Sequence, residues 1–75
     1  MKEAKENLNE AVQEILSAEM KHIRPALSNI EAIIKEQGIR DGFAKEILAR
    51  NNLHHVLSLL DEVKVLVTTA AKEIE

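Results

Sequence analysis

The sequence predicts an all-α antiparallel hairpin of two long helices, on the evidence of its composition, one turn and its apolar spacing. The 75 residues include two Gly, one Pro and one aromatic residue, Phe43, and are rich in Ala, Leu, Ile, Glu and Lys. These five are mostly strong helix formers, and no segment alternates apolar and polar residues as a half-buried strand would. We expect residues 1–75 to form one small helical domain.

The turn is predicted at residues 37–42, where both glycines lie. Gly38 is suited to the left-handed conformation that closes a helix, and Asp41 is suited to cap the next helix by accepting backbone N–H bonds. The predicted elements are therefore a helix over about residues 3–36 and a helix over about residues 43–74.

The first predicted helix carries one apolar stripe and is interrupted by Pro25. The members of the stripe are three or four residues apart, as on one face of a helix: Leu8, Val12, Leu16, Met20, Ile23, Leu27, Ile30 and Ile34. A proline inside a helix removes one hydrogen bond and clashes with the preceding turn. We expect a kink near residues 21–25, with a break and Pro25 in the first turn of a new helix as the alternative. The stripe stays in phase through Pro25, which favours the kink.

The second predicted helix carries two apolar stripes. The first stripe comprises Ala44, Leu48, Asn52, Val56, Leu59, Val63, Leu66, Ala70 and Ile74, and the second comprises Leu53, Leu57, Leu60, Val67 and Ala71. The pair Asn51-Asn52 either caps a new helix or lies within one continuous helix, with Asn52 buried as a polar residue that fixes the packing register. Continuity is favoured, because the first stripe keeps its phase through the pair.

This second helix is too apolar to be covered by one neighbour. Nine of the fifteen residues from 53 to 67 are apolar, whereas a two-helix seam needs about two positions in seven. We expect two hairpins to associate into a four-helix bundle dimer. The alternative is a monomeric three- or four-helix bundle that folds back at Pro25 and at Asn51-Asn52. The predicted interface residues are Leu16, Ile23, Leu27, Ile30, Leu53, Val56, Leu57, Leu60, Val63, Leu66 and Val67.

Charge and motifs exclude several function classes. Ten Lys and Arg interleave with thirteen Asp and Glu, giving a net charge of −3 and no basic stripe for nucleic acid. No apolar run is long enough for a membrane span, and the charged first residues do not resemble a secretion signal. The absence of Cys fits a cytoplasmic location. No catalytic or phosphate-binding motif is present. We therefore expect no cofactor or small-molecule substrate, and a non-enzymatic regulatory or structural adaptor that binds itself and another protein.

Glu19 and His22 form a Glu-x-x-His pair, which binds metal in some helical bundles. Because Glu19 falls in the middle of the apolar stripe, we expect it instead in a polar contact with Lys64 or Asn52, and His22 at the rim. A carboxylate–histidine metal site at Glu19 and His22 is kept as a third hypothesis. The two remaining histidines, His54 and His55, are predicted to lie on the surface.

The string His22-Ile23-Arg24-Pro25-Ala26-Leu27, followed by Ile30, resembles the dimerisation and phosphotransfer hairpin of histidine kinases. Residues 46–63 are similar in pattern to the second helix of that family. The resemblance implies a dimeric hairpin in which His22 is the phosphoacceptor and Pro25 supplies the adjacent kink. The acidic residue that follows the phosphoacceptor in the family has no counterpart after His22. Phosphotransfer through His22 is therefore the alternative function.

Overall fold

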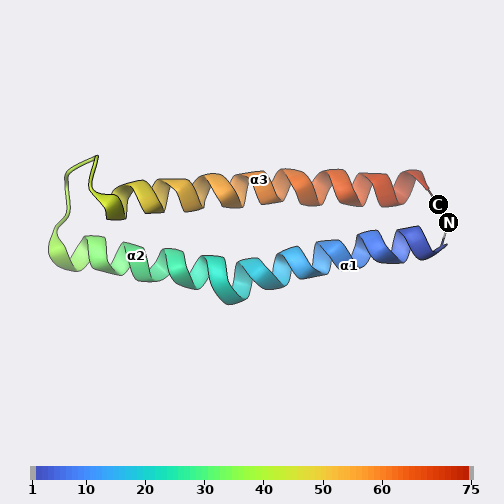
Figure 1. The fold of residues 1–75 in the computed structure, drawn as a ribbon, viewed down its shortest axis with the longest axis horizontal. Helices are drawn as coiled ribbons and strands as arrows, with labels where there is room; N and C mark the ends of the chain where they lie inside the picture. Colours follow the sequence, from blue (N-terminus) through green and yellow to red (C-terminus); the bar gives the residue numbers. More distant parts are fainter. Residues whose placement is uncertain (1, 75) are drawn as a thin grey trace.

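The computed structural model describes residues 2–74, which form an antiparallel helical hairpin. Its elements are α1 (Lys2–Ala18), the π-helical turn η1 (Glu19–Ile23), α2 (Arg24–Gln37) and α3 (Lys45–Glu73). The segment α1–η1–α2 runs along one side and α3 returns along the other, so that α1 begins where α3 ends (Figure 1). No strand occurs among the described residues. The predicted hairpin is confirmed, with α3 beginning two residues later than expected.

Gly38 ends α2 as predicted. It adopts the left-handed conformation, with φ of 61°, and its N–H points at the carbonyls of Ile34 and Lys35. The next N–H, that of Ile39, donates to the Ile34 carbonyl at 3.1 Å. A side chain at residue 38 would strain this backbone conformation, which is why glycine closes the helix.

Asp41 shapes the loop but does not cap α3, which corrects the prediction. Its carboxylate accepts the Phe43 N–H at 2.8 Å, and its carbonyl accepts the Ala44 N–H at 3.1 Å. The capping position of α3 is Ala44, which makes no side-chain capping bond. Asp41 therefore closes an Asx-type turn just before the helix, and Phe43 is left 88% exposed.

The predicted interruption near Pro25 takes the form of the π-helical turn η1. Within it the Arg24 N–H donates to the carbonyl of Glu19, five residues earlier. Pro25 follows in the first turn of α2 and has no N–H to donate, so the usual ladder cannot continue unchanged. The helix axis bends at this turn, but the chain does not fold back on itself (Figure 1). This confirms a kink near residues 21–25.

Helix α3 continues through Asn51-Asn52 without a break, as the phase of its first stripe predicts. Asn52 is exposed, however, so the expectation of a buried asparagine is wrong. Because the chain folds back neither at Pro25 nor at Asn51-Asn52, the alternative of a monomeric three- or four-helix bundle is excluded.

The two sides of the hairpin meet along one seam, which we define by residues that are buried or half-buried at heptad spacing. On the first side the seam comprises Leu8, Val12, Ile15, Glu19, Ile23, Leu27, Ile30 and Ile34. On the other side it comprises Arg50, Leu53, Leu57, Leu60, Lys64, Val67 and Ala71 from α3, and Ile74 directly after that helix. Leu16 and Met20 are 36% and 71% exposed; their predicted place in the stripe is taken by Ile15 and Glu19.

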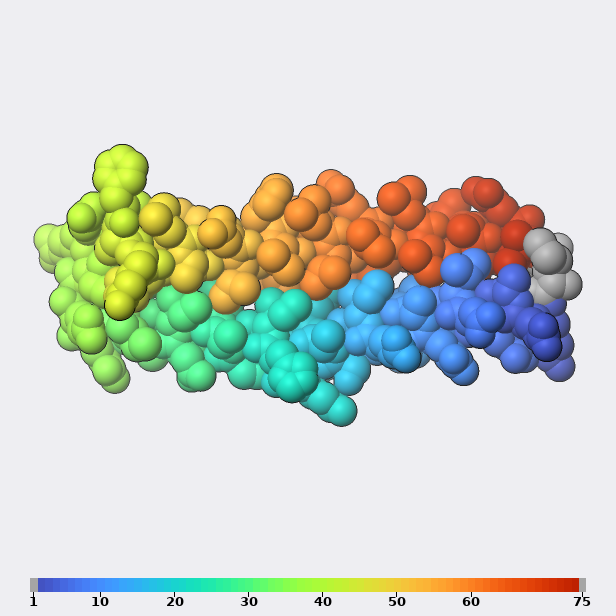
Figure 2. Space-filling model, in the orientation of Figure 1, coloured from blue at the N-terminus to red at the C-terminus, as the bar shows by residue number. Residues whose placement is uncertain are grey.

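The seam gives the hairpin a thin core. Leu27, Leu57 and Ala71 are its only buried apolar residues among those described, and no side chain there is completely enclosed. The Cα atoms span 53 × 19 × 12 Å, so the molecule is a single layer of two rods packed side by side (Figure 2). Both broad faces of this layer remain open.

Candidate interaction surface

The two broad faces can be told apart by one side-chain contact across the hairpin. Glu31 and His54 approach to 3.5 Å across the hairpin, and each follows a seam residue, Ile30 and Leu53 respectively. Successive residues of a helix are about 100° apart. Residues that follow a seam position therefore lie on one face, and residues that precede a seam position lie on the other.

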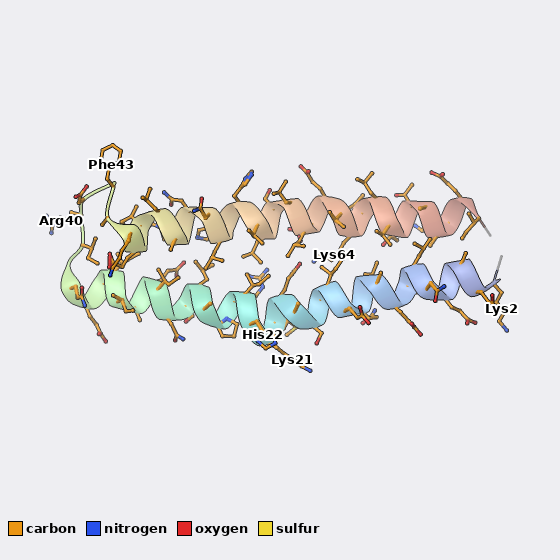
Figure 3. The ribbon with its side chains drawn as sticks, in the orientation of Figure 1. Lys2, Lys21, His22, Arg40, Phe43 and Lys64 are labelled. Atoms are coloured by element: carbon orange, nitrogen blue, oxygen red, sulfur yellow. The ribbon has the colours of Figure 1, made fainter. Side chains whose placement is uncertain are left out.

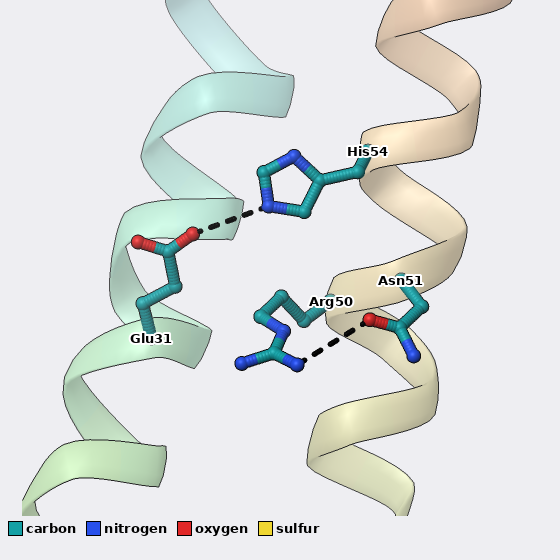
Figure 4. A network of polar contacts seen from close by, with 4 residues as sticks. All are labelled: Glu31, Arg50, Asn51 and His54. Atoms are coloured by element: carbon teal, nitrogen blue, oxygen red, sulfur yellow. Dashed lines mark hydrogen bonds and ion pairs between the residues drawn. The ribbon is translucent and has the colours of Figure 1, made fainter.

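The face that contains Glu31 and His54 is mainly polar, and we call it the polar face. Arg50 donates to the Asn51 side chain beside this Glu31–His54 contact, at 3.5 Å (Figure 4). A shallow depression here is lined by Glu31, Ile34, Lys35, Arg50, Asn51 and His54. The apolar exceptions at residues following the seam are Leu16, Met20 and Val65.

The opposite face, which we call the apolar face, consists largely of aliphatic residues that precede a seam position. Its members are Ala11, Ala18, Ala26 and Ile33 from the first side, and Ala49, Val56, Leu59, Val63, Leu66 and Ala70 from α3. Its outer edge along the first side is polar, with Asn7, Glu14, His22 and Asn29. The α3 half carries four large apolar side chains that are 36% to 68% exposed.

A buried ion pair joins the two sides of the hairpin near its middle. The Glu19 side chain is 4% exposed, and its Oε1 lies 2.9 Å from Lys64 Nζ. The lysine also meets Asp61 Oδ1 at 3.1 Å and points toward the first side (Figure 3). Although the distance is short, Oε1 accepts no hydrogen bond of good geometry. The contact is therefore best described as an ion pair, and it confirms the predicted polar contact of Glu19.

This arrangement raises the pKa of Lys64 above its usual 10.5. The close contact with Glu19 is the largest cause, the contact with Asp61 adds to it, and partial burial acts in the opposite direction. Because both contacts favour the charged form, Lys64 carries its positive charge at neutral pH. A pair of charges among apolar residues fixes which residues lie opposite one another, because any slip of the seam would separate them.

The predicted interface residues divide between the seam and the open surface. Val56, Val63 and Leu66 lie on the apolar face, and Leu16 lies on the polar face. The others belong to the seam within one hairpin: Ile23, Leu27, Ile30, Leu53, Leu57, Leu60 and Val67. Their contact with a second copy stays a prediction.

The sequence reasoning missed the alanine row of the apolar face. Ala11 and Ala18 are seven residues apart, Ala26 follows after eight, and Ile33 after seven more. The regular spacing could have indicated one continuous helix face. Its single eight-residue step spans the π turn, which inserts one residue into the heptad and so keeps the row on the same face.

The histidines are on the surface, as predicted for His54 and His55. His22 is exposed at the π turn and points away from α3 (Figure 3), whereas Glu19 points into the seam against Lys64. The structure therefore does not bring Glu19 and His22 together. Within residues 2–74, no group of three His, Cys, Asp or Glu residues is arranged to hold a metal ion.

In comparisons with known proteins, no family model, curated protein or solved structure matches this chain. Among the described helices, none combines the length and the apolar character that crossing a membrane requires.

Proposed function

We propose that the hairpin is a non-enzymatic helical interaction module that self-associates through its apolar face into a four-helix bundle. The exposure of large aliphatic side chains on this one face carries the proposal. Soluble monomers rarely leave large contiguous apolar patches uncovered. The side chains concerned are Ile33, Val56, Leu59, Val63 and Leu66, which are 36% to 68% exposed.

The size of the face supports a second copy as the occupant. The Cα outline of this face measures 53 by 19 Å, about 1,000 Å² in projection, so two copies stacked along their full length offer an area of the size that stable protein interfaces bury. The thin core of one hairpin gives the reason for association, since so short a chain gains little stability from three buried apolar residues. The second hairpin would supply the missing half of the core.

The role we propose is regulatory or structural, with a further protein as the partner of the assembled bundle. Helical modules recognise other helices through grooves and apolar faces of this kind. In this proposal the polar face, with Glu31, Asn51 and His54, stays in solvent on the outside of the bundle.

The test is the mass of the wild-type chain in solution, measured by sedimentation equilibrium over a wide concentration range. The proposal expects twice the chain mass of 8.4 kDa at micromolar concentrations, with dissociation on dilution. A mass of one chain at every concentration would contradict it.

Phosphotransfer through His22 is a second candidate, favoured by the position of this residue. His22 is exposed, points away from α3 (Figure 3) and lies in a π turn directly before the proline-containing first turn of α2. π turns inside helices often occur at functional sites. An accessible imidazole on a dimeric hairpin is what the resemblance to histidine-kinase hairpins implies.

The candidate is tested by incubating the chain with a kinase core or a phosphorylated response regulator and looking for acid-labile phosphate. Phosphate that appears on the wild type and on His55→Ala, but not on His22→Ala, supports phosphotransfer. Absence of label, or label that survives in His22→Ala, eliminates it.

A further inference from the structure

We infer, building on the self-association proposed above, that the second copy docks in one orientation: α3 lies antiparallel against α3 of the other copy, about a two-fold axis level with residue 61. Two arrangements of a hairpin dimer compete. In one, α3 packs on α3 and α1–η1–α2 packs on its own counterpart. In the other, α3 of each copy packs on α1–η1–α2 of its partner.

The distribution of polarity over the apolar face favours α3 against α3. Leu59 and Leu66 are 45% and 68% exposed and lie toward the outer edge of α3. On the first side the corresponding outer edge is polar, with Asn7, Glu14, His22 and Asn29. Packing α3 on the first side of the partner would press these leucines against polar groups, which costs free energy when hydrogen-bond partners are lost. Packing α3 on α3 brings leucine and valine together, and it places the polar edges of the two first sides against each other instead of against leucine.

The spacing along α3 suits an antiparallel pairing. The apolar face of α3 runs Asn52, Val56, Leu59, Val63, Leu66, Ala70, with steps of four, three, four, three and four. The steps read the same in both directions and centre on residue 61. A two-fold axis at that level places Leu59 of one copy opposite Val63 of the other. It also places Val56 opposite Leu66. This is the self-complementarity that a symmetric interface requires.

The first side provides an independent check on the position of this axis. Glu19 lies opposite Lys64 in the seam, so residue 61 is level with about residue 22. A two-fold axis at residue 22 places Ala18 of one copy opposite Ala26 of the other. Because both side chains are small, the two backbones can approach closely, and the whole apolar face is buried rather than α3 alone. The apolar residues of α3 and the alanines of the first side are thus both arranged symmetrically about the same two-fold axis.

Disulfide cross-linking tests this orientation, and the chain has no cysteine of its own to interfere. Separately produced Leu59→Cys and Val63→Cys chains are mixed in equal amounts, oxidised gently and analysed by intact mass. A disulfide needs Cβ atoms about 4 Å apart, so the mixed species should form several-fold faster than in two comparison mixtures. These are Ala18→Cys with Val63→Cys, which reports the competing arrangement, and Val65→Cys with Val63→Cys, which reports random collision.

Each outcome decides between the proposals. Preferential formation of the Leu59–Val63 species supports the orientation. Preferential formation of the Ala18–Val63 species, with sedimentation still showing a dimer, overturns the orientation and leaves self-association standing. Equal slow cross-linking of all mixtures together with a monomeric mass of the wild type contradicts self-association itself.

Discussion

The two broad faces of the hairpin are built from the same helices and differ by one residue in register. Most residues that precede a seam position are aliphatic, for example Ala18, Val56 and Val63. Most residues that follow a seam position are polar, for example Glu31 and His54. One residue rotates a side chain by about 100° around a helix. The position of the seam therefore determines which surface is exposed to a partner. Because the π turn and the Glu19–Lys64 pair help to set that position, they also help to determine the interface.

The largest change in folding stability should come from the seam on which both faces depend. Leu57 is 9% exposed, and Leu57→Ala removes its buried side chain, which should lower the free energy of unfolding by about 3 kcal/mol. Chemical denaturation followed by circular dichroism measures the loss. The matched control is Val65→Ala at a site 65% exposed, where we expect a change within about 0.5 kcal/mol. Equal losses at the two sites would show that the seam is misplaced.

The buried Glu19–Lys64 pair bears on the difference between the two faces because it fixes the register of the seam. Lys64→Met leaves the Glu19 carboxylate buried without its partner, so we expect lower thermal stability at pH 7. The double variant Glu19→Leu with Lys64→Met should recover much of the loss, since no charge is then buried. If Lys64→Met melts at the wild-type temperature, the pair has no part in fixing the seam.

The same pair predicts a dependence on alkaline pH. Contacts with Glu19 and Asp61 raise the folded-state pKa of Lys64 above 10.5, so its stabilising contribution is complete below pH 10.5 and is lost as the pH rises through the folded-state pKa. The stability difference between the wild type and Lys64→Met should therefore stay constant from neutral pH to about pH 10 and narrow above it. A stability difference that narrows between pH 7 and 9 would show that a group other than Lys64 causes the pH dependence.

The smallest effect should come from the polar face. Glu31 and His54 are about half exposed and 3.5 Å apart, and even a fully charged pair of exposed side chains contributes little to stability. Glu31→Gln should change the free energy of unfolding by less than about 0.5 kcal/mol and leave the mass in solution unaltered. A dimer that dissociates in Glu31→Gln would instead assign the interface to the polar face.

Much of the fold follows from local sequence signals. The hairpin, the glycine that closes α2, the continuity of α3 and a polar contact of Glu19 across the hairpin were all predictable, since each depends on the spacing or on the conformational preference of a few residues. Which of Lys64 and Asn52 would be the partner of Glu19 was not predictable, and neither was the exact seam. Steps of four residues make Leu16 and Met20 look equivalent to Ile15 and Glu19, and only packing against α3 decides between them.

The apolar face was predictable in part for the same reason. The excess of apolar residues in α3 shows that a second surface exists, but which residues form it depends on the seam. Leu57 and Leu60 therefore look as suitable for a partner as Val56 and Val63 until the hairpin is closed. The alanine row depends on the extra residue of the π turn, which no single residue encodes.

The central claim, that a second copy covers the apolar face, is tested most directly by the same substitution on each side of α3. Val63→Glu places a charge on the apolar face, and Val65→Glu places one two residues away, on the other face. Both positions are open in the single hairpin, 40% and 65% exposed, so both variants should keep the helical content of the wild type. Measured by sedimentation at the same concentration, Val63→Glu should have the mass of one chain and Val65→Glu that of two. Two variants of equal mass, or a dimer lost only in Val65→Glu, would contradict the claim.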